Sequence, residues 1–136
     1  MNLHKKLTLK STYEDIEKLE PYLSDLQKEI GFNNDLYAKL MLTVSEAVTN
    51  SVVHGNKLDE SKSVVVRAKS DGKLLEFMIS DEGQGFEPDD VPNPLEKENL
   101  LKTSGRGVFL MNEYAEDVSY SKDGTTLTLI FHITEQ

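Results

Sequence analysis

Apolar residues recur at helical spacing along a long central segment of the chain. Across residues 36–56 they gather on one broad face of an α-helix, as Tyr37, Leu40, Met41, Val44, Val48 and Val52. The polar residues Glu46, Asn50 and His54 follow at intervals of four and stack within an arc of roughly 80° on the opposite side. Gly55 comes next, as glycines do just beyond a helix end. The pattern predicts a helix that buries one face and presents a carboxylate, an amide and an imidazole on the other.

The segment before this helix changes from strand spacing to helix spacing. Residues 3–10 alternate loosely between apolar and polar side chains, which predicts a first strand. Ser11 and Glu14 have the spacing of a capping box, so we expect a helix to start there. Apolar residues then continue at helical spacing as far as Gly31, and Pro21 predicts a kink or a break among them.

The C-terminal half is dominated by strand patterns. Two pairs of apolar runs flank an Asp-Gly dipeptide, which is a strong hairpin signal: residues 64–70 with 74–80, and 118–121 with 125–131. Residues 108–114 suit a short helix. About three main helices and five strands, with hairpins dominating, predict an α+β fold. We expect a two-layer sandwich, a mixed but mostly antiparallel sheet with helices on one face.

Composition narrows the class of protein. The 136 residues predict one domain, 1–136, with a single core. A net charge of −9 without a Lys/Arg cluster argues against direct nucleic-acid binding, but a few backbone amides can still hold a phosphate. Cysteine is absent, which excludes disulfides and thiol catalysis. Since the first residues lack an apolar leader and no run reaches membrane-spanning length, we expect a cytoplasmic protein with no membrane partner.

Two glycine-rich segments are candidates for ligand binding. Residues 81–86, Asp-Glu-Gly-Gln-Gly-Phe, begin where a predicted strand ends, and their glycines allow a ligand to approach the backbone. Residues 104–107, Ser-Gly-Arg-Gly, precede a predicted helix and would form an anion cradle. Taken singly, residues 81–86 could be an ordinary turn, and residues 104–107 could be a glycine-rich helix entry. Glu46 and Asn50 could likewise be part of a solvated helix face. The proline-containing loop between the two segments is expected to act as a lid.

The four segments together closely resemble the sequence boxes of a known superfamily. In chain order they are Glu46-x-x-x-Asn50-x-x-x-His54-Gly55-Asn56, Asp81-x-Gly83-x-Gly85-Phe86, Gly105-Arg106-Gly107 and Gly124-Thr125-Thr126. They resemble the N, G1, G2 and Gly-Thr boxes of the GHKL ATP-binding superfamily, which includes gyrase, histidine kinases and MutL. The resemblance covers about residues 8–133 and implies a Bergerat-type fold. The details look most like the bacterial anti-sigma-factor serine kinases.

The resemblance implies a role for each matching residue. Glu46 would be the general base, Asn50 the Mg²⁺ ligand, and Asp81 the acceptor of the adenine amino group. Thr125 or Thr126 would lie on the adenine side, an ambiguity of one residue. The remaining candidates would complete the nucleotide site, with the last three at the phosphates: His54, Gly83, Gly85, Phe86, Gly105, Arg106 and Gly107.

The implied function is an ATP- and Mg²⁺-dependent serine/threonine kinase. It would phosphorylate an anti-anti-sigma protein of the STAS type and sequester a sigma factor, with homodimer formation left open. The alternative is a nucleotide-gated binding regulator with little or no phosphotransfer. Glu46 favours the kinase, because a module that only binds has no need of a base beside the phosphates.

Overall fold

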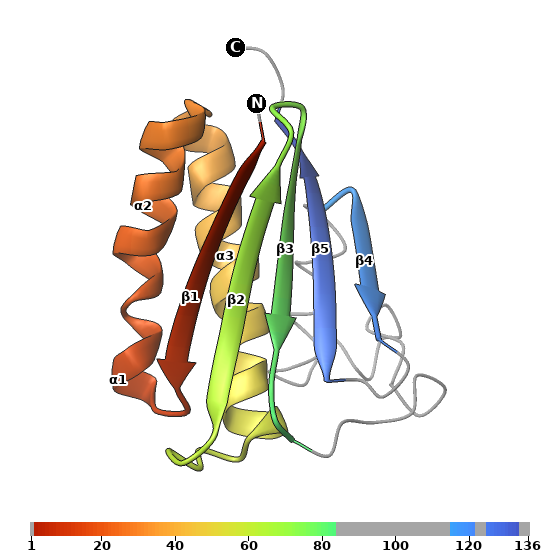
Figure 1. Cartoon of the computed structure of the whole chain (residues 1–136). Helices are drawn as coiled ribbons and strands as arrows, with labels where there is room; N and C mark the ends of the chain where they lie inside the picture. The colour runs from red at the N-terminus through yellow and green to blue at the C-terminus, as the bar shows by residue number, and fades with distance from the viewer. Residues whose placement is uncertain (1, 84–114, 122–124, 134–136) are drawn as a thin grey trace, which may run out of the picture.

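The computed structural model describes residues 2–83, 115–121 and 125–133. In order, the elements are β1 (Leu3–Lys10), α1 (Tyr13–Ile16), α2 (Leu19–Ile30), α3 (Asn34–Asn50), the π-helical turn η1 (Ser51–Gly55), β2 (Ser63–Ser70), β3 (Leu74–Ser80), β4 (Asp117–Tyr120) and β5 (Thr126–His132). The five strands form one sheet in the order β1-β2-β3-β5-β4, and every pairing among them is antiparallel. The helices cover one face of it (Figure 1). The predicted α+β sandwich is confirmed.

The strand register follows from the two hairpins. Gly72 adopts a φ of +95°, which favours glycine, and the Asp71 carboxylate accepts hydrogen bonds from the N–H groups of Lys73 and Leu74 at 2.8 and 2.9 Å. This confirms the first hairpin. Strands β4 and β5 also pair as predicted, with Val118 opposite Leu129, and the turn between them lies outside the described residues. The helix expected at 108–114 lies outside them too.

The first helical region is broken between Ile16 and Leu19, and not at Pro21 as predicted. Its N-cap is Thr12 and not Ser11, because the Thr12 hydroxyl accepts the Asp15 N–H at 3.1 Å while Ser11 is fully buried in other contacts. Helix α1 ends after one turn, and α2 restarts at Leu19. Pro21 therefore lies in the first turn of α2, where its missing N–H costs no intrahelical hydrogen bond.

Helix α3 starts at an asparagine cap and ends in an unusual turn. The Asn33 side chain accepts the Leu36 N–H at 2.9 Å. From Ser51 the helix widens, and the Asn56 N–H donates to the Ser51 carbonyl five residues back at 2.8 Å. The predicted arc assumed α-helical rotation as far as Gly55, so the widened turn that carries His54 is a correction to the predicted helix. Widened turns of this kind often lie at functional sites.

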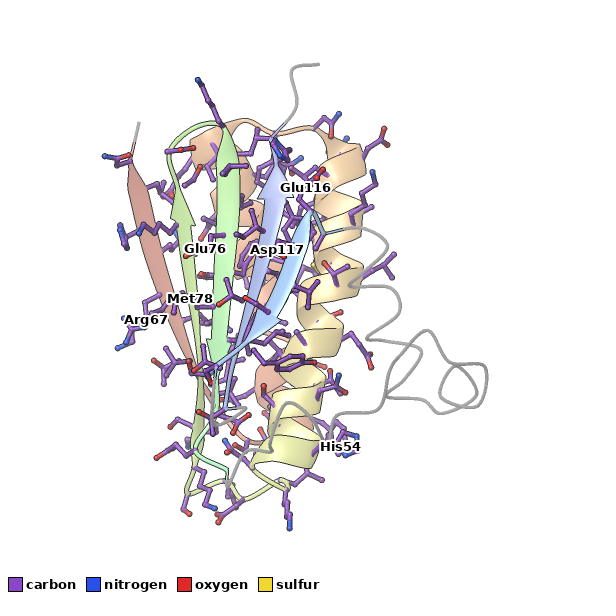
Figure 2. All side chains as sticks on the ribbon, turned by 90° about the vertical axis from the view of Figure 1, so that its right-hand side faces the viewer. His54, Arg67, Glu76, Met78, Glu116 and Asp117 are labelled. Carbon is purple, nitrogen blue, oxygen red and sulfur yellow. The ribbon has the colours of Figure 1, made fainter. Side chains whose placement is uncertain are left out.

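The core lies between the helices and the sheet face that they cover. Phe77 and Phe131, on neighbouring strands, meet edge to face with ring centroids 6.1 Å apart. None of the described helices lies over the other face, from which Arg67, Glu76 and Met78 project (Figure 2). Among the described residues, no helix is long and apolar enough to cross a membrane.

Candidate functional site

Three of the predicted sequence boxes come together, in their described residues, at one end of the sheet. There the last turn of the long helix, η1, lies beside the end of β3 and the start of β5 (Figure 1). Asp81 directly follows β3, and its N–H donates to the Thr125 carbonyl at 2.9 Å. The N box, the G1 box and the Gly-Thr box, which are far apart in the sequence, are thus in contact through the fold.

Asp81 is held in a tight turn over Gly55. One carboxylate oxygen, Oδ1, accepts the Gly83 N–H at 2.9 Å. A Cβ built on Gly55 would overlap the carboxylate, with Cγ only 2.6 Å away. Gly55 was predicted as a helix stop, and its place at the end of η1 agrees with that. The close approach of Asp81 is the reason why only glycine fits at this position.

Gly83 makes a second close approach at the same place. A Cβ on Gly83 would overlap the Gly55 carbonyl group, with the carbonyl carbon 2.7 Å away. The glycine was expected to give a ligand access to the backbone. Within the described residues, the end of η1 is what lies against Gly83. Gly55 and Gly83 therefore allow the N box and the G1 box to pack closely together.

The structure separates the two threonines. Thr126 lies opposite Ser80, and their hydroxyl oxygens are 3.0 Å apart on the face without helices. Successive side chains of a strand point to opposite faces. Thr125, opposite Asp81, therefore lies on the side of the nucleotide-site candidates, and Thr126 does not.

Glu46, Asn50 and His54 lie along the helix above this junction. Glu46 and Asn50 are half-buried, whereas His54 is exposed near the end of the helix (Figure 2). Burial raises the pKa of the Glu46 carboxyl above its ordinary value, and the charge of His54 opposes that shift. The resulting group is a carboxylate that takes a proton more readily than a solvated one.

The predicted Mg²⁺ site would have one protein ligand among the described residues, the Asn50 amide. These residues contain no group of three or more His, Asp or Glu residues that could bind a metal. Mg²⁺ at phosphates characteristically keeps waters and takes only one or two protein oxygens, which the Asn50 amide can supply. The other predicted residues, Gly85, Phe86, Gly105, Arg106 and Gly107, lie outside the described residues, as does the expected lid.

Sequence reasoning assigned no role to Asn56 or Glu82 in the site. Asn56 is 1% exposed, and its side-chain oxygen accepts the Glu82 N–H at 2.8 Å. The Glu82 carboxylate in turn accepts the Ser63 N–H. No local signal marks these contacts, because Asn56, Glu82 and Ser63 are far apart in the sequence. The sequence shows only that an asparagine follows the last glycine of the helix.

The chain belongs to the histidine kinase-like ATPase domain family, whose model matches residues 9–131. It is 32% identical to the anti-sigma F factor of Anoxybacillus flavithermus over 88% of this chain and 78% of that protein. It is 30% identical to the serine-protein kinase RsbW of Listeria monocytogenes and 28% identical to that of Listeria innocua, each over 98% of this chain and 91% of the relative. The predicted superfamily and branch are confirmed.

Proposed function

We propose that this protein is an ATP- and Mg²⁺-dependent serine/threonine kinase that acts as a cytoplasmic anti-sigma factor. It would phosphorylate an anti-anti-sigma protein and sequester a sigma factor. The observation that carries the proposal is the junction of Gly55, Asp81 and Thr125 at the end of the helix that bears Glu46 and Asn50. The names of the relatives, an anti-sigma factor and serine-protein kinases, support the same activity.

The junction suits the recognition of adenine. Asp81 is fixed on one side by Thr125 and on the other by Gly83. A carboxylate accepts several hydrogen bonds at once, so Asp81 can bind the exocyclic amino group of adenine as well as the Gly83 N–H. Guanine presents a carbonyl oxygen at that position, which a carboxylate repels. The site is therefore expected to prefer ATP to GTP.

The helix above the junction supplies the groups for phosphotransfer. Asn50 would hold the nucleotide through Mg²⁺, which when bound neutralises phosphate charge. Glu46 lies one helical turn earlier on the same face, where it would orient the serine hydroxyl of the partner and accept its proton. A base is most effective when its pKa approaches the working pH, and burial shifts Glu46 in that direction.

We propose that the face of the sheet that no described helix covers binds a second copy of this chain. Across the strands, His4 pairs with Lys69, Lys69 with Glu76, Glu76 with Ile130 and Ile130 with Asp117, so that these side chains form one row. A second row contains Lys6, Arg67 and Met78. The β1–β2 half of the face is thus basic and the β3–β4 half is acidic.

This polarity selects one symmetry for the proposed homodimer. A two-fold axis parallel to the strands would place the basic half of one copy over the acidic half of the other. Met78, 37% exposed, and Ile130 would be buried at the centre. An axis perpendicular to the strands would instead oppose like charges.

The direct test is phosphotransfer to a partner. The purified protein is incubated with Mg²⁺ and ATP labelled on the γ-phosphate, together with the anti-anti-sigma protein encoded beside it. Label on a serine of the partner is the expected result. Failure with several candidate partners, while a sigma factor is still bound, would establish the alternative of sequestration without phosphotransfer.

A further inference from the structure

Asn56 connects four separate segments of the chain through one buried amide. Its Nδ2 group donates to the Ser11 hydroxyl at 2.8 Å and to the Ser63 carbonyl at 3.0 Å. Its Oδ1 atom accepts the Glu82 N–H at 2.8 Å. These partners lie just after β1, at the start of β2 and just after β3, while Asn56 itself follows η1.

The orientation of this amide is determined by its surroundings. Nδ2 faces a carbonyl oxygen, and Oδ1 faces a backbone N–H, so a flipped amide would place donor against donor and acceptor against acceptor. Ser11, which is fully buried, completes the cluster by donating its own hydroxyl hydrogen to the Lys62 carbonyl at 2.8 Å. The network is fully hydrogen-bonded, and such buried networks are rigid.

The bond to Glu82 fixes the peptide that carries Asp81. The Asp81 N–H is held by Thr125, and the next N–H along the chain, that of Glu82, is held by Asn56. The peptide groups before and after the Asp81 Cα are therefore both held by hydrogen bonds. The carboxylate can turn only about its own side-chain bonds, over the surface of Gly55.

We propose that Asn56 is a positioning residue for adenine recognition, which its amide supports by fixing the peptide between Asp81 and Glu82. The inference rests on the proposed role of Asp81 in binding the adenine amino group. Asn56 itself does not touch the nucleotide. Its contribution is that the carboxylate is already in place when the nucleotide arrives, so no binding energy is lost in ordering the turn.

The test compares ATP and GTP affinities in Asn56→Ala and Ser11→Ala. Ser11→Ala is the matched control, because it removes a buried hydrogen bond of the same cluster but leaves the bond to Glu82 intact. Asn56→Ala should weaken ATP binding by roughly 10-fold, the size of one buried hydrogen bond. GTP affinity should stay at the parental value. Ser11→Ala should lower thermal stability but keep the parental ratio of ATP to GTP affinity.

A double-mutant cycle connects the effect to Asp81. In an Asp81→Asn background, Asn56→Ala should have no further effect on ATP affinity, because the carboxylate that it positions is gone. Additive losses would overturn the inference, and so would a parental ATP-to-GTP ratio in Asn56→Ala. Equal binding of ATP and GTP by the parent would instead overturn the role of Asp81 and the inference with it.

Hydrogen exchange keeps the inference testable should Asn56→Ala fail to fold. In the parent without nucleotide, the Glu82 amide should exchange as slowly as the amides of β3. In Ser11→Ala it should remain slow. Exchange of the Glu82 amide in the parent at the rate of an open loop would show that Asn56 does not hold this peptide, and the inference would fail.

Discussion

The carboxylate of Asp81 occupies the space into which a side chain at Gly55 would project. A Cβ at Gly55 would lie 2.6 Å from the carboxylate carbon, closer than real Cβ atoms come. The close contact with Asp81 therefore requires a glycine at this position, whereas the helix end alone does not, since Gly55 has no positive φ. Its neighbour Asn56 holds the same loop from the other side, so the end of this helix and the loop after β3 form one unit.

Gly55→Ala should weaken ATP binding by displacing Asp81. The added methyl group and the carboxylate cannot both keep their positions, so the turn over residues 81–83 must shift. We expect a loss of roughly 10- to 100-fold in ATP affinity, measured by calorimetry, because a hydrogen bond to a charged group is lost.

Gly72→Ala provides the control for this prediction. Gly72 lies in the β2–β3 turn with a φ of +95° and nothing within 4 Å of a built Cβ, so alanine there costs backbone strain alone. It should lower the melting temperature and leave ATP affinity unchanged. Parental affinity in Gly55→Ala would mean that Asp81 does not bind the nucleotide.

The elements that the sequence predicted best are those with local causes. Asp71-Gly72 determines its hairpin through a glycine φ and two bonds to one aspartate, all within a few residues. The helix is capped by Thr12 and not by the predicted Ser11, because the Ser11 hydroxyl is buried in a hydrogen bond with Asn56. The Asn56 network depends on Ser11 and Glu82, which are distant in sequence, and no periodicity reveals it. The widened turn at Ser51 was missed because the apolar pattern was interpreted as α-helical throughout.

Glu46→Gln should stabilise the protein at neutral pH. Burial raises the pKa of Glu46, so the folded state disfavours its charged form. The resulting penalty is absent below the ordinary glutamate pKa of about 4.3 and develops as the pH rises through the higher folded-state pKa. The melting temperature of Glu46→Gln should therefore be higher than that of the parent at pH 7 and equal to it at pH 4. Glu60→Gln, at an exposed turn position, is the control, and its melting temperature should not exceed that of the parent at pH 7.

The same substitution should abolish phosphotransfer while sparing ATP binding. Removing a positioned general base typically lowers the rate by about 10²- to 10⁴-fold. Asn50→Ala should differ, because it weakens Mg²⁺-dependent ATP binding itself. Calorimetry and the mass shift of the phosphorylated partner, measured on both variants, separate the two roles. If Glu46→Gln phosphorylates the partner at the parental rate, Glu46 is not the general base.

His54→Ala should shift the pH dependence of phosphotransfer. The charge of His54 lowers the pKa of Glu46 and so partly offsets the effect of burial. Without it the pKa of Glu46 rises further, and the acid limb of the rate profile should move to higher pH. The Lys28→Glu variant, on the exposed side of α2, should leave the profile unchanged. An unmoved acid limb in His54→Ala would mean that the limb does not report Glu46.

Charge reversal on the sheet face should control dimer formation. The variant Arg67→Glu with Lys69→Glu replaces the positive charges of β2 with negative ones, and the variant Glu76→Lys with Asp117→Lys makes the acidic half of the face basic. Each alone should be monomeric in light-scattering chromatography, because the proposed two-fold axis opposes like charges. Mixed one to one, they should form a heterodimer that weakens as salt is added.

The control for the charge reversals lies on the opposite side of the molecule. Lys28→Glu with Lys39→Glu changes the net charge by the same amount as the acidic variant, but both residues are exposed on helices α2 and α3. This variant should dimerise like the parent, which shows that location matters and not net charge. A parent that stays monomeric at high concentration would refute the proposed dimer. Reversal variants that dimerise alone but do not pair with each other would place the contact on another surface.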